Sequence, residues 1–216
     1  MKKIPILFVA AAIIGCNNTG NETAKTPKAD SPAVASAPAK TETPAPPPMD
    51  SATAMKKWKE YMTPGDMHKM LAASDGKWTT EITSWEDENK PPQKSTGTCE
   101  NKMILGGRYQ ESIHKSDMMG MPFESRSMTG YDNSRKVFVN TWQDNMGTGI
   151  IYMEGAYDAA TKTLTLKGQC DDPVKGKIQM RQTLKMIDDK NKFMELYAAS
   201  AGGKETKLIE MKFVKK

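Results

Sequence analysis

The sequence predicts a mainly β protein, an antiparallel up-and-down barrel of roughly ten strands preceded by short helices. First, short segments rich in β-forming residues recur at intervals of about ten residues beyond Ser74. Second, residues suited to tight reversals separate these segments, for example Gly106-Gly107 and Asn145-Met146-Gly147. Third, a sheet of about ten strands in one domain tends to close, because closure removes exposed edges.

The chain begins with the features of an export signal. Lys2 and Lys3 precede an apolar run from Ile4 to Ile14, which is too short to span a bilayer as a mature helix. The stretch IIGC, ending at Cys16, resembles the lipobox of bacterial lipoproteins, and this implies cleavage before Cys16 and its lipidation. Several acyl chains on one residue hold a protein firmly, so we predict a membrane anchor at Cys16. Because Asn17 rather than Asp follows, we predict the outer membrane rather than the inner one.

Four segments follow from composition: a signal peptide (1–15), a lipidated cysteine with a tether (16–50), short helices (51–73) and the barrel (74–216). The tether is rich in Pro, Ala, Thr and Lys and nearly free of large apolar residues. Such a segment cannot bury enough apolar surface to offset its ordering entropy, so we expect it to be disordered. The remainder is long enough for one domain with a sizeable core.

Two short helices are expected before the barrel. In 51–62, Met55, Trp58 and Met62 recur at a spacing of three and four residues, which predicts one apolar helical face. A second helix is predicted from Thr63, as the N-cap, to about Ala73, with proline in the first helical position.

The ten strands are expected between turns that contain residues suited to tight reversals, mainly Gly, Asn and Asp. Their predicted ranges are Lys77–Glu86, Ser95–Leu105, Arg108–Lys115, Phe123–Gly130, Lys136–Asp144, Thr148–Tyr157, Thr163–Gln169, Lys177–Met186, Lys192–Ala199 and Thr206–Val214.

Charge and motifs exclude several classes of function. Basic and acidic residues are interleaved, and no basic stripe of the kind that binds nucleic acid is present. The sequence has no Gly-x-Ser-x-Gly elbow, no HExxH and no phosphate-binding glycine loop. The carboxylates of Asp132 and Asp144, at predicted strand ends, are interpreted as groups that fix turns. We therefore expect neither an enzyme nor a nucleic-acid binder, and no cofactor.

Beyond Cys16, two cysteines remain. An oxidising compartment favours pairing Cys99 with Cys170. They lie in different predicted strands, however, and a bridge needs Cα atoms within roughly 7 Å. Two unpaired thiols are expected, with the disulfide as the alternative.

The segment from Ile104 to Gly168 resembles a bacterial family known as domain of unknown function 1579. The motifs that carry the resemblance are LGGRY, GMPFE, GYD, W-x-D and GxYD, and the likeness extends from His68 to Lys216. Gly76-Lys77-Trp78 also has the Gly-x-Trp form found on the first strand of lipocalins. The resemblance implies a calycin-like barrel, in agreement with the strand count.

Trp78 is the predicted plug of this barrel. In the lipocalin pattern the Gly-x-Trp indole closes the narrow end beneath a cation from the last strand, which implies Lys212 or Lys215 here. Trp85 lies an odd number of residues further on and should point to the opposite face of the strand. For Trp85 a surface position under the helices and a ligand contact are both open.

Five residues are candidates for ligand binding inside the barrel. Glu195 and Glu210 on neighbouring predicted strands could share one face, with Arg181 close enough to neutralise one of them. A slip of one residue in register would turn them outward, where they would be solvated charges. Trp142 and Tyr109, from the W-x-D and LGGRY motifs, complete the set.

Two further ligands are alternatives. Met118, Met119 and Met121, with His114, have the soft ligands that suit Cu(I), although methionines also line promiscuous apolar surfaces. His68 and His114 are the only histidines, which excludes a histidine-rich zinc site. Some calycin-type barrels hold haem through one histidine, so haem is the other alternative.

The expected function is binding of a small, partly apolar molecule inside a lipid-anchored barrel. The main alternative is an interaction module of the cell envelope whose barrel is filled by its own side chains. Binding of Cu(I) or haem and an uncharacterised enzyme are the remaining alternatives.

Overall fold

The computed structural model describes residues 49–85, 90–118, 120–200 and 202–216. The predicted signal peptide, the anchor at Cys16 and nearly all of the tether lie outside the described residues. The elements are α1 Ser51–Met62, α2 Asp66–Ala72, β1 Gly76–Ser84, β2 Gln93–Ile104, β3 Tyr109–Met118, β4 Met121–Asp132, β5 Val137–Asp144, β6 Ile151–Asp158, β7 Thr163–Asp172, β8 Gly176–Met186, β9 Asn191–Ser200 and β10 Thr206–Lys215. No helix among these residues is long and apolar enough to cross a membrane.

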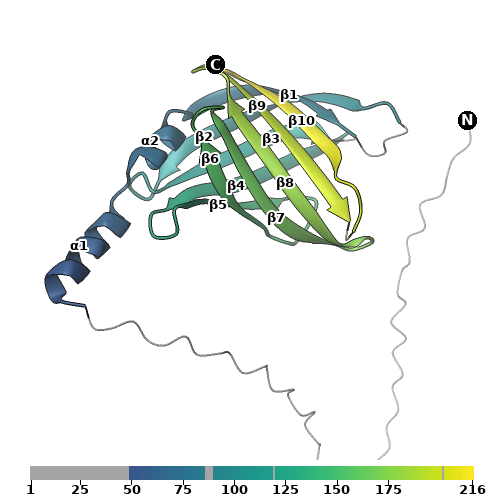
Figure 1. The fold of residues 1–216 in the computed structure, drawn as a ribbon. Coiled ribbons are helices and arrows are strands. Elements are labelled where there is room, and N and C mark those ends of the chain that lie inside the picture. Colours follow the sequence, from purple (N-terminus) through teal and green to yellow (C-terminus); the bar gives the residue numbers. More distant parts are fainter. Residues whose placement is uncertain (1–48, 86–89, 119, 201) are drawn as a thin grey trace, which may run out of the picture. The chain divides into compact units, whose positions relative to one another are not determined.

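The strands form a closed antiparallel barrel in sequence order, and β1 pairs with β10 to complete it (Figure 1). The predicted fold class is therefore confirmed. Each turn joins neighbouring strands, because two antiparallel strands need only a short connection. Closure leaves the sheet of described strands without an unpaired edge strand.

Side chains alternate between the inside and the outside of the barrel, as the pleat requires. On β10, Met211 and Phe213 are buried inside, whereas Lys212 between them is exposed. The pairing of β9 with β10 shifts by one residue between Lys207 and Ile209, a bulge that sets the register of the remaining residues.

The helices differ in how firmly they contact the barrel. In α2, His68 and Leu71 are buried, and the helix contacts β2, β3 and β4. No residue of α1 is buried, although Asn133 and Arg108 donate hydrogen bonds to the carbonyls at its C-terminal end. The prediction that Thr63 is the N-cap of the second helix was wrong. Thr63 is the C-cap of α1, and its hydroxyl donates to Lys59 O.

The helix α2 begins two residues after its predicted proline position. Gly65 is its N-cap, and the Gly65 N–H donates to His68 Nδ1 over 3.0 Å. A histidine acceptor therefore satisfies a backbone donor at the start of the helix.

One end of the barrel, which we call the closed end, is sealed by Trp78 and α2. Trp78 is 1% exposed, and its Nε1–H donates to Ser74 O over 3.0 Å. Asn101 Nδ2 donates to the same carbonyl, and Gln110 Nε2 donates to Leu71 O and to Asp75. The predicted plug is thus held in a network that ties α2 to three strands.

The interior has two different walls. Apolar residues of β6 to β10, such as Met153, Leu164 and Leu166, form much of the buried core. The facing wall, on β2 to β5, is largely polar. Its buried polar residues are Asn101, Gln110, Ser112, Ser125, Ser127, Thr129 and Asn140.

The two described cysteines are unpaired, as expected. Cys99 lies on β2 and Cys170 on β7, and these strands are five steps apart in either direction around the barrel. They lie on opposite walls, so no bridge forms.

Candidate ligand-binding site

The end opposite Trp78, which we call the open end, contains a pocket with a volume of about 520 Å³. We call it the outer pocket. Ends of strands from both walls line it, because the barrel has no helix cap there within the described residues. Its lining residues are Ile82, Ser84, Gln93, Lys94, Ser95, Thr96, Ser116, Asp117, Met118, Gly120, Phe123, Trp142, Ile151, Met153, Met180, Gln182, Met194, Leu196, Ile209 and Met211.

The outer pocket is mainly apolar and rich in methionine. Five of its lining residues are methionines: Met118, Met153, Met180, Met194 and Met211. Thioether side chains are flexible and polarizable, and they adapt to ligands of different shape.

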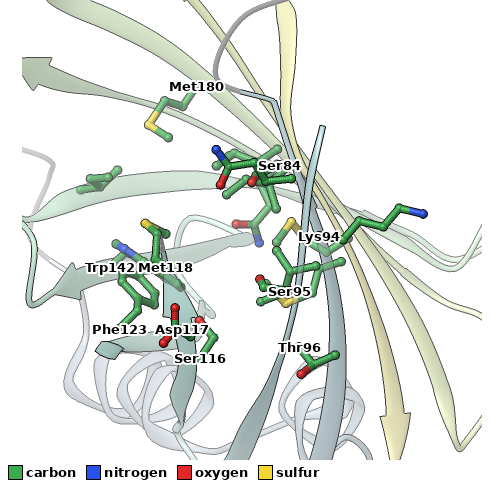
Figure 2. Close-up of a pocket in the computed structure, with 18 of the residues that line it drawn as sticks. Ser84, Lys94, Ser95, Thr96, Ser116, Asp117, Met118, Phe123, Trp142 and Met180 are labelled. Carbon is green, nitrogen blue, oxygen red and sulfur yellow. The ribbon is translucent and has the colours of Figure 1, made fainter. Parts of the chain in front are cut away.

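Aromatic side chains occupy one side of this pocket. Trp142 stacks on Phe123 with ring centroids 6.5 Å apart, and Figure 2 shows the two side chains close to Met118. The indole Nε1–H donates to Asp144 over 2.9 Å, which fixes the ring. Lys94 also lines the pocket, but its side chain extends away from it in Figure 2.

A second, smaller cavity lies deeper in the barrel, toward the closed end. Its volume is about 80 Å³, and we call it the inner chamber. Trp142, Gln182 and Met194 line both cavities, so side chains alone separate the two. The residues of the inner chamber include the polar set Ser74, Cys99, Asn101, Gln110, Ser112, His114, Ser127, Thr129, Asn140 and Lys192.

His114 lines the inner chamber, next to Trp142. Its ring lies 5.5 Å from the Trp142 ring, and the surface it retains faces the inner chamber. Burial lowers the pKa of His114 from its ordinary 6.5 to about 4, helped by the positive charge of Lys192. The imidazole is therefore neutral at neutral pH.

Two buried polar atoms in this region have no hydrogen-bond partner among the described residues: His114 Nδ1 and Ser125 Oγ. Ser125 is 1% exposed and lies directly opposite His114 in the pairing of β3 with β4. Buried polar atoms are nearly always hydrogen-bonded, so two of them on neighbouring positions suggest a missing partner.

The cation above Trp78 is Lys192. Its Nζ lies 3.9 Å from the Trp78 ring centroid and 5.1 Å from that of Phe213. Lys215 also approaches Trp78, at 5.4 Å, as one form of the prediction had it. Lys212 does not contribute, because it alternates with Met211 and Phe213 and faces outward.

Cys99 is not a nucleophile in this structure. Burial raises the pKa of the Cys99 thiol to about 12, so it stays protonated at neutral pH. Its Sγ donates to Asn101 Oδ1 over 3.0 Å and lies 3.8 Å from His114 Nε2.

Three predicted ligand-binding residues lie on the outer surface of the barrel. Glu195 and Glu210 are cross-strand partners that share one face, as expected, but their strand neighbours Met194 and Met211 line the outer pocket. Both carboxylates pair with Lys207. Arg181 faces outward too, and it pairs with Glu205 rather than with either of them.

The other two predicted residues have different positions. Trp142 lines both cavities. Tyr109 does not: its ring lies over Gly130 on the outside, near a cavity of about 200 Å³ beside α1. Trp85 faces the outside as well, with Lys207 Nζ 5.9 Å from its ring, and it lies at the open end rather than under the helices.

The structure does not support the copper alternative. His114 lies inside the barrel, whereas Met121 is 48% exposed at a hairpin tip. His114 and Met118 are four strand residues apart, a distance of about 13 Å, too far to share one ion. Met119 lies outside the described residues. No group of three or more His, Cys, Asp or Glu residues suited to a metal ion occurs in the part that the structure describes.

Haem does not fit the available histidines. His68 accepts a hydrogen bond from Gly65 at the start of α2. His114 faces a chamber of about 80 Å³, too small for a macrocycle, and it does not line the outer pocket.

The carboxylates at strand ends fix turns, as interpreted from the sequence. Asp132 Oδ1 accepts hydrogen bonds from the backbone of Ser134 and Arg135. Asp144 Oδ1 accepts from the backbone of Met146 and Gly147.

Sequence reasoning missed Lys192 and the methionines of four strands. Lys192 has the same strand parity as Met194 and Leu196, which both line the outer pocket. The methionine content, 17 in the chain, was a further signal that the interior is lined by thioethers.

Fold and site together define a ten-stranded antiparallel barrel with one sealed end and one end open to a pocket. The family model described as protein of unknown function (DUF1579) matches residues 63–215, so the chain belongs to this family. The predicted family membership is thereby confirmed.

Similarity to one solved structure supports the fold. The crystal structure of Rv2717c from M. tuberculosis is similar, with 11% sequence identity and a TM-score of 0.53, over 71% of this chain and 99% of that chain. A redesigned β-barrel matches 70% of this chain and 99% of its own, with 9% identity and a TM-score of 0.36. The comparison with curated proteins gives no match.

Proposed function

We propose that this protein binds a small, partly apolar molecule in the outer pocket and does not transform it. The observation that carries the proposal is the pocket itself. Its volume of about 520 Å³ lies within the usual range for small-molecule sites, and its walls are mainly apolar with a few polar groups.

The methionine lining favours binding of a class of related ligands rather than of one specific compound. Burial of apolar surface supplies most of the binding free energy in such a site, and flexible side chains let the wall follow the ligand. We expect selectivity by length and polarity rather than by exact shape.

The alternative of a filled barrel has less support. A barrel used only as an interaction module would be packed by its own side chains, whereas this interior contains two cavities. The outer face of the barrel carries surface ion pairs, such as that between Lys207 and Glu195, and pairs of this kind are common on soluble domains.

The first test is fluorescence titration with the neutral apolar probe N-phenyl-1-naphthylamine. The wild type should bind it with a large fluorescence gain. Met180→Trp fills the outer pocket and should reduce the affinity at least about tenfold, a change that corresponds to about 1.4 kcal/mol.

Met128→Trp is the matched control, because Met128 lies on the outer face of β4 and is 37% exposed. It should bind the probe like the wild type. Equal loss in both variants, or no binding by the wild type, would refute the proposal.

The second test is native mass spectrometry of protein purified from its host. A retained small molecule that Met180→Trp loses supports the proposal. A mass equal to that of the polypeptide with its modifications in both proteins favours the filled-barrel alternative.

The membrane anchor stays a prediction, and it is part of the proposed function. Lipidation at Cys16 would hold the barrel near a membrane, a source of apolar ligands. Cys16→Ser should shift the protein from the membrane fraction to the soluble fraction of cells. Unchanged membrane association would count against the anchor but not against the pocket.

A further inference from the structure

We propose that the ligand is an amphiphile with an anionic head group of carboxylate size, whose head enters the inner chamber beside Lys192 while its tail fills the outer pocket. This inference rests on the proposed function and specifies the ligand class. Three observations carry it: a buried cation without a counter-ion, an unpartnered polar atom on a residue that lines the chamber, and a side-chain partition between the cavities.

Lys192 is a buried cation without a counter-ion. It is 5% exposed, and within the described residues its Nζ has neither an ion pair nor a hydrogen bond, only the faces of Trp78 and Phe213. A buried charge is costly unless it is paired. Lys192 lines the inner chamber, so an anion placed there would complete the site.

The charged and titratable groups around Lys192 do not supply that anion. Asp75 acts on it from outside ion-pair distance, and its two oxygens already accept hydrogen bonds from Gln110 and Met103 N. The Cys99 thiol stays protonated, because burial raises its pKa to about 12. His114 is neutral, and Lys215 adds positive charge.

One of the two orphaned polar atoms belongs to a residue that lines the inner chamber, His114. Neutral His114 can carry a proton on Nδ1 and donate it to an anion, whereas Ser125, the other orphan, lies opposite His114 on β4 but lines neither cavity. Both residues lie on the polar wall of the barrel, on β4 and β3. Hydrogen bonds to a charged acceptor are stronger than those between neutral groups.

The chamber has the right size and position for a small head group. A volume of about 80 Å³ corresponds to roughly two or three water molecules, enough for a carboxylate but not for a chain. Gln182 and Met194, two flexible side chains, stand with Trp142 between it and the outer pocket. A rotation of these side chains would join the two cavities into one amphiphile-shaped site.

The experiment compares decanoate with decan-1-ol, which differ only in the head group. Each competes with N-phenyl-1-naphthylamine for the wild type and for Lys192→Met in the full chain. The wild type should bind decanoate at least about tenfold more tightly than decan-1-ol, because charged hydrogen bonds contribute about that factor. Lys192→Met should abolish this preference while binding decan-1-ol as well as the wild type does.

Lys192→Met should fold, because an apolar side chain of similar length replaces an unpaired buried charge. Circular dichroism and thermal unfolding check this. Lys207→Met is the matched control, since Lys207 lies on the outer face between Glu195 and Glu210. It should keep the full preference for decanoate.

A second measurement keeps the test independent of any variant. Burial lowers the pKa of Lys192 from 10.5 to about 8. Lys192 therefore loses its charge as the pH rises through this value, although a bound anion shifts the loss upward. Decanoate affinity should fall between pH 7 and 10, and decan-1-ol affinity should stay constant.

The outcomes separate the two proposals. If N-phenyl-1-naphthylamine does not bind at all, the proposed function itself fails. A different result is that the probe and both competitors bind while the wild type shows no preference for decanoate over decan-1-ol, or while Lys192→Met shows the same preference as the wild type. In either case the inference fails, and the pocket takes neutral ligands. A decanoate affinity that is independent of pH also contradicts the inference.

Discussion

The two ends of the barrel are built from the same strands but are packed in opposite ways. At the closed end, Trp78 is almost fully buried, bonded to Ser74 O and covered by Lys192. At the open end, ends of the same strands line a pocket of about 520 Å³. The contrast indicates that the closed end supplies stability, which allows the open end to keep a pocket.

The largest expected effect comes from Trp78→Ala. It removes a fully buried indole from the closed end and should lower the free energy of unfolding by about 3–5 kcal/mol, measured by urea denaturation. Trp58→Ala, on the exposed helix α1, is the control and should change it by less than about 0.5 kcal/mol. Similar losses in both variants would mean that the closed end is not the stabilising region.

The second effect concerns pH and His114, which lies between the ends. The unfolded chain protonates this histidine as the pH falls through 6.5, whereas the folded protein keeps it neutral down to about pH 4. The unfolded state therefore binds more protons in this window, and the free energy of unfolding falls by about 3 kcal/mol as the pH falls.

His114→Gln isolates this effect, because the carboxylates still titrate in the variant. Urea denaturation at several pH values between 7 and 4 should show a shallower loss in the variant than in the wild type. Parallel curves would show that His114 is not buried as a neutral group.

The smallest effect on stability is expected at the rim of the open end. Ile150 and Val174 are 68% and 89% exposed, and their replacement by serine should change the free energy of unfolding by less than about 0.5 kcal/mol. Losses above about 1 kcal/mol would show that the rim is part of the folded core.

Much of the fold could be predicted because its signals are local. Turn residues and β-forming segments gave all ten strands, and Gly76-Lys77-Trp78 indicated the plug. The start of α2 was misplaced because Thr63 caps the end of α1 instead.

The site was harder, because alternation is ambiguous where both faces are apolar. On β9, Phe193 and Tyr197 flank Glu195 on the outside, while Met194 and Leu196 line the pocket, so composition does not identify the inner face. On β10 the inward residues Ile209, Met211 and Phe213 alternate with Glu210 and Lys212, and the predictions for Glu210 and Lys212 overlooked this alternation.

The polar wall reverses the usual rule. On β3, Gln110 and Ser112 are buried inside, and on β4 the serines at 125 and 127 are buried while Met128 is exposed. A rule that assigns apolar residues to the interior does not predict such a wall. The polar residues that line the inner chamber together with Lys192 were therefore not predicted.

The most direct test of a ligand-binding pocket at the open end uses methyl NMR of protein with labelled methionine methyl groups, titrated with N-phenyl-1-naphthylamine. The methyl signals of Met153, Met180, Met194 and Met211 should shift together, while those of Met55, Met62 and Met128 on the surface stay in place. Shifts confined to the surface methionines, or none at all, would contradict a ligand-binding pocket at the open end.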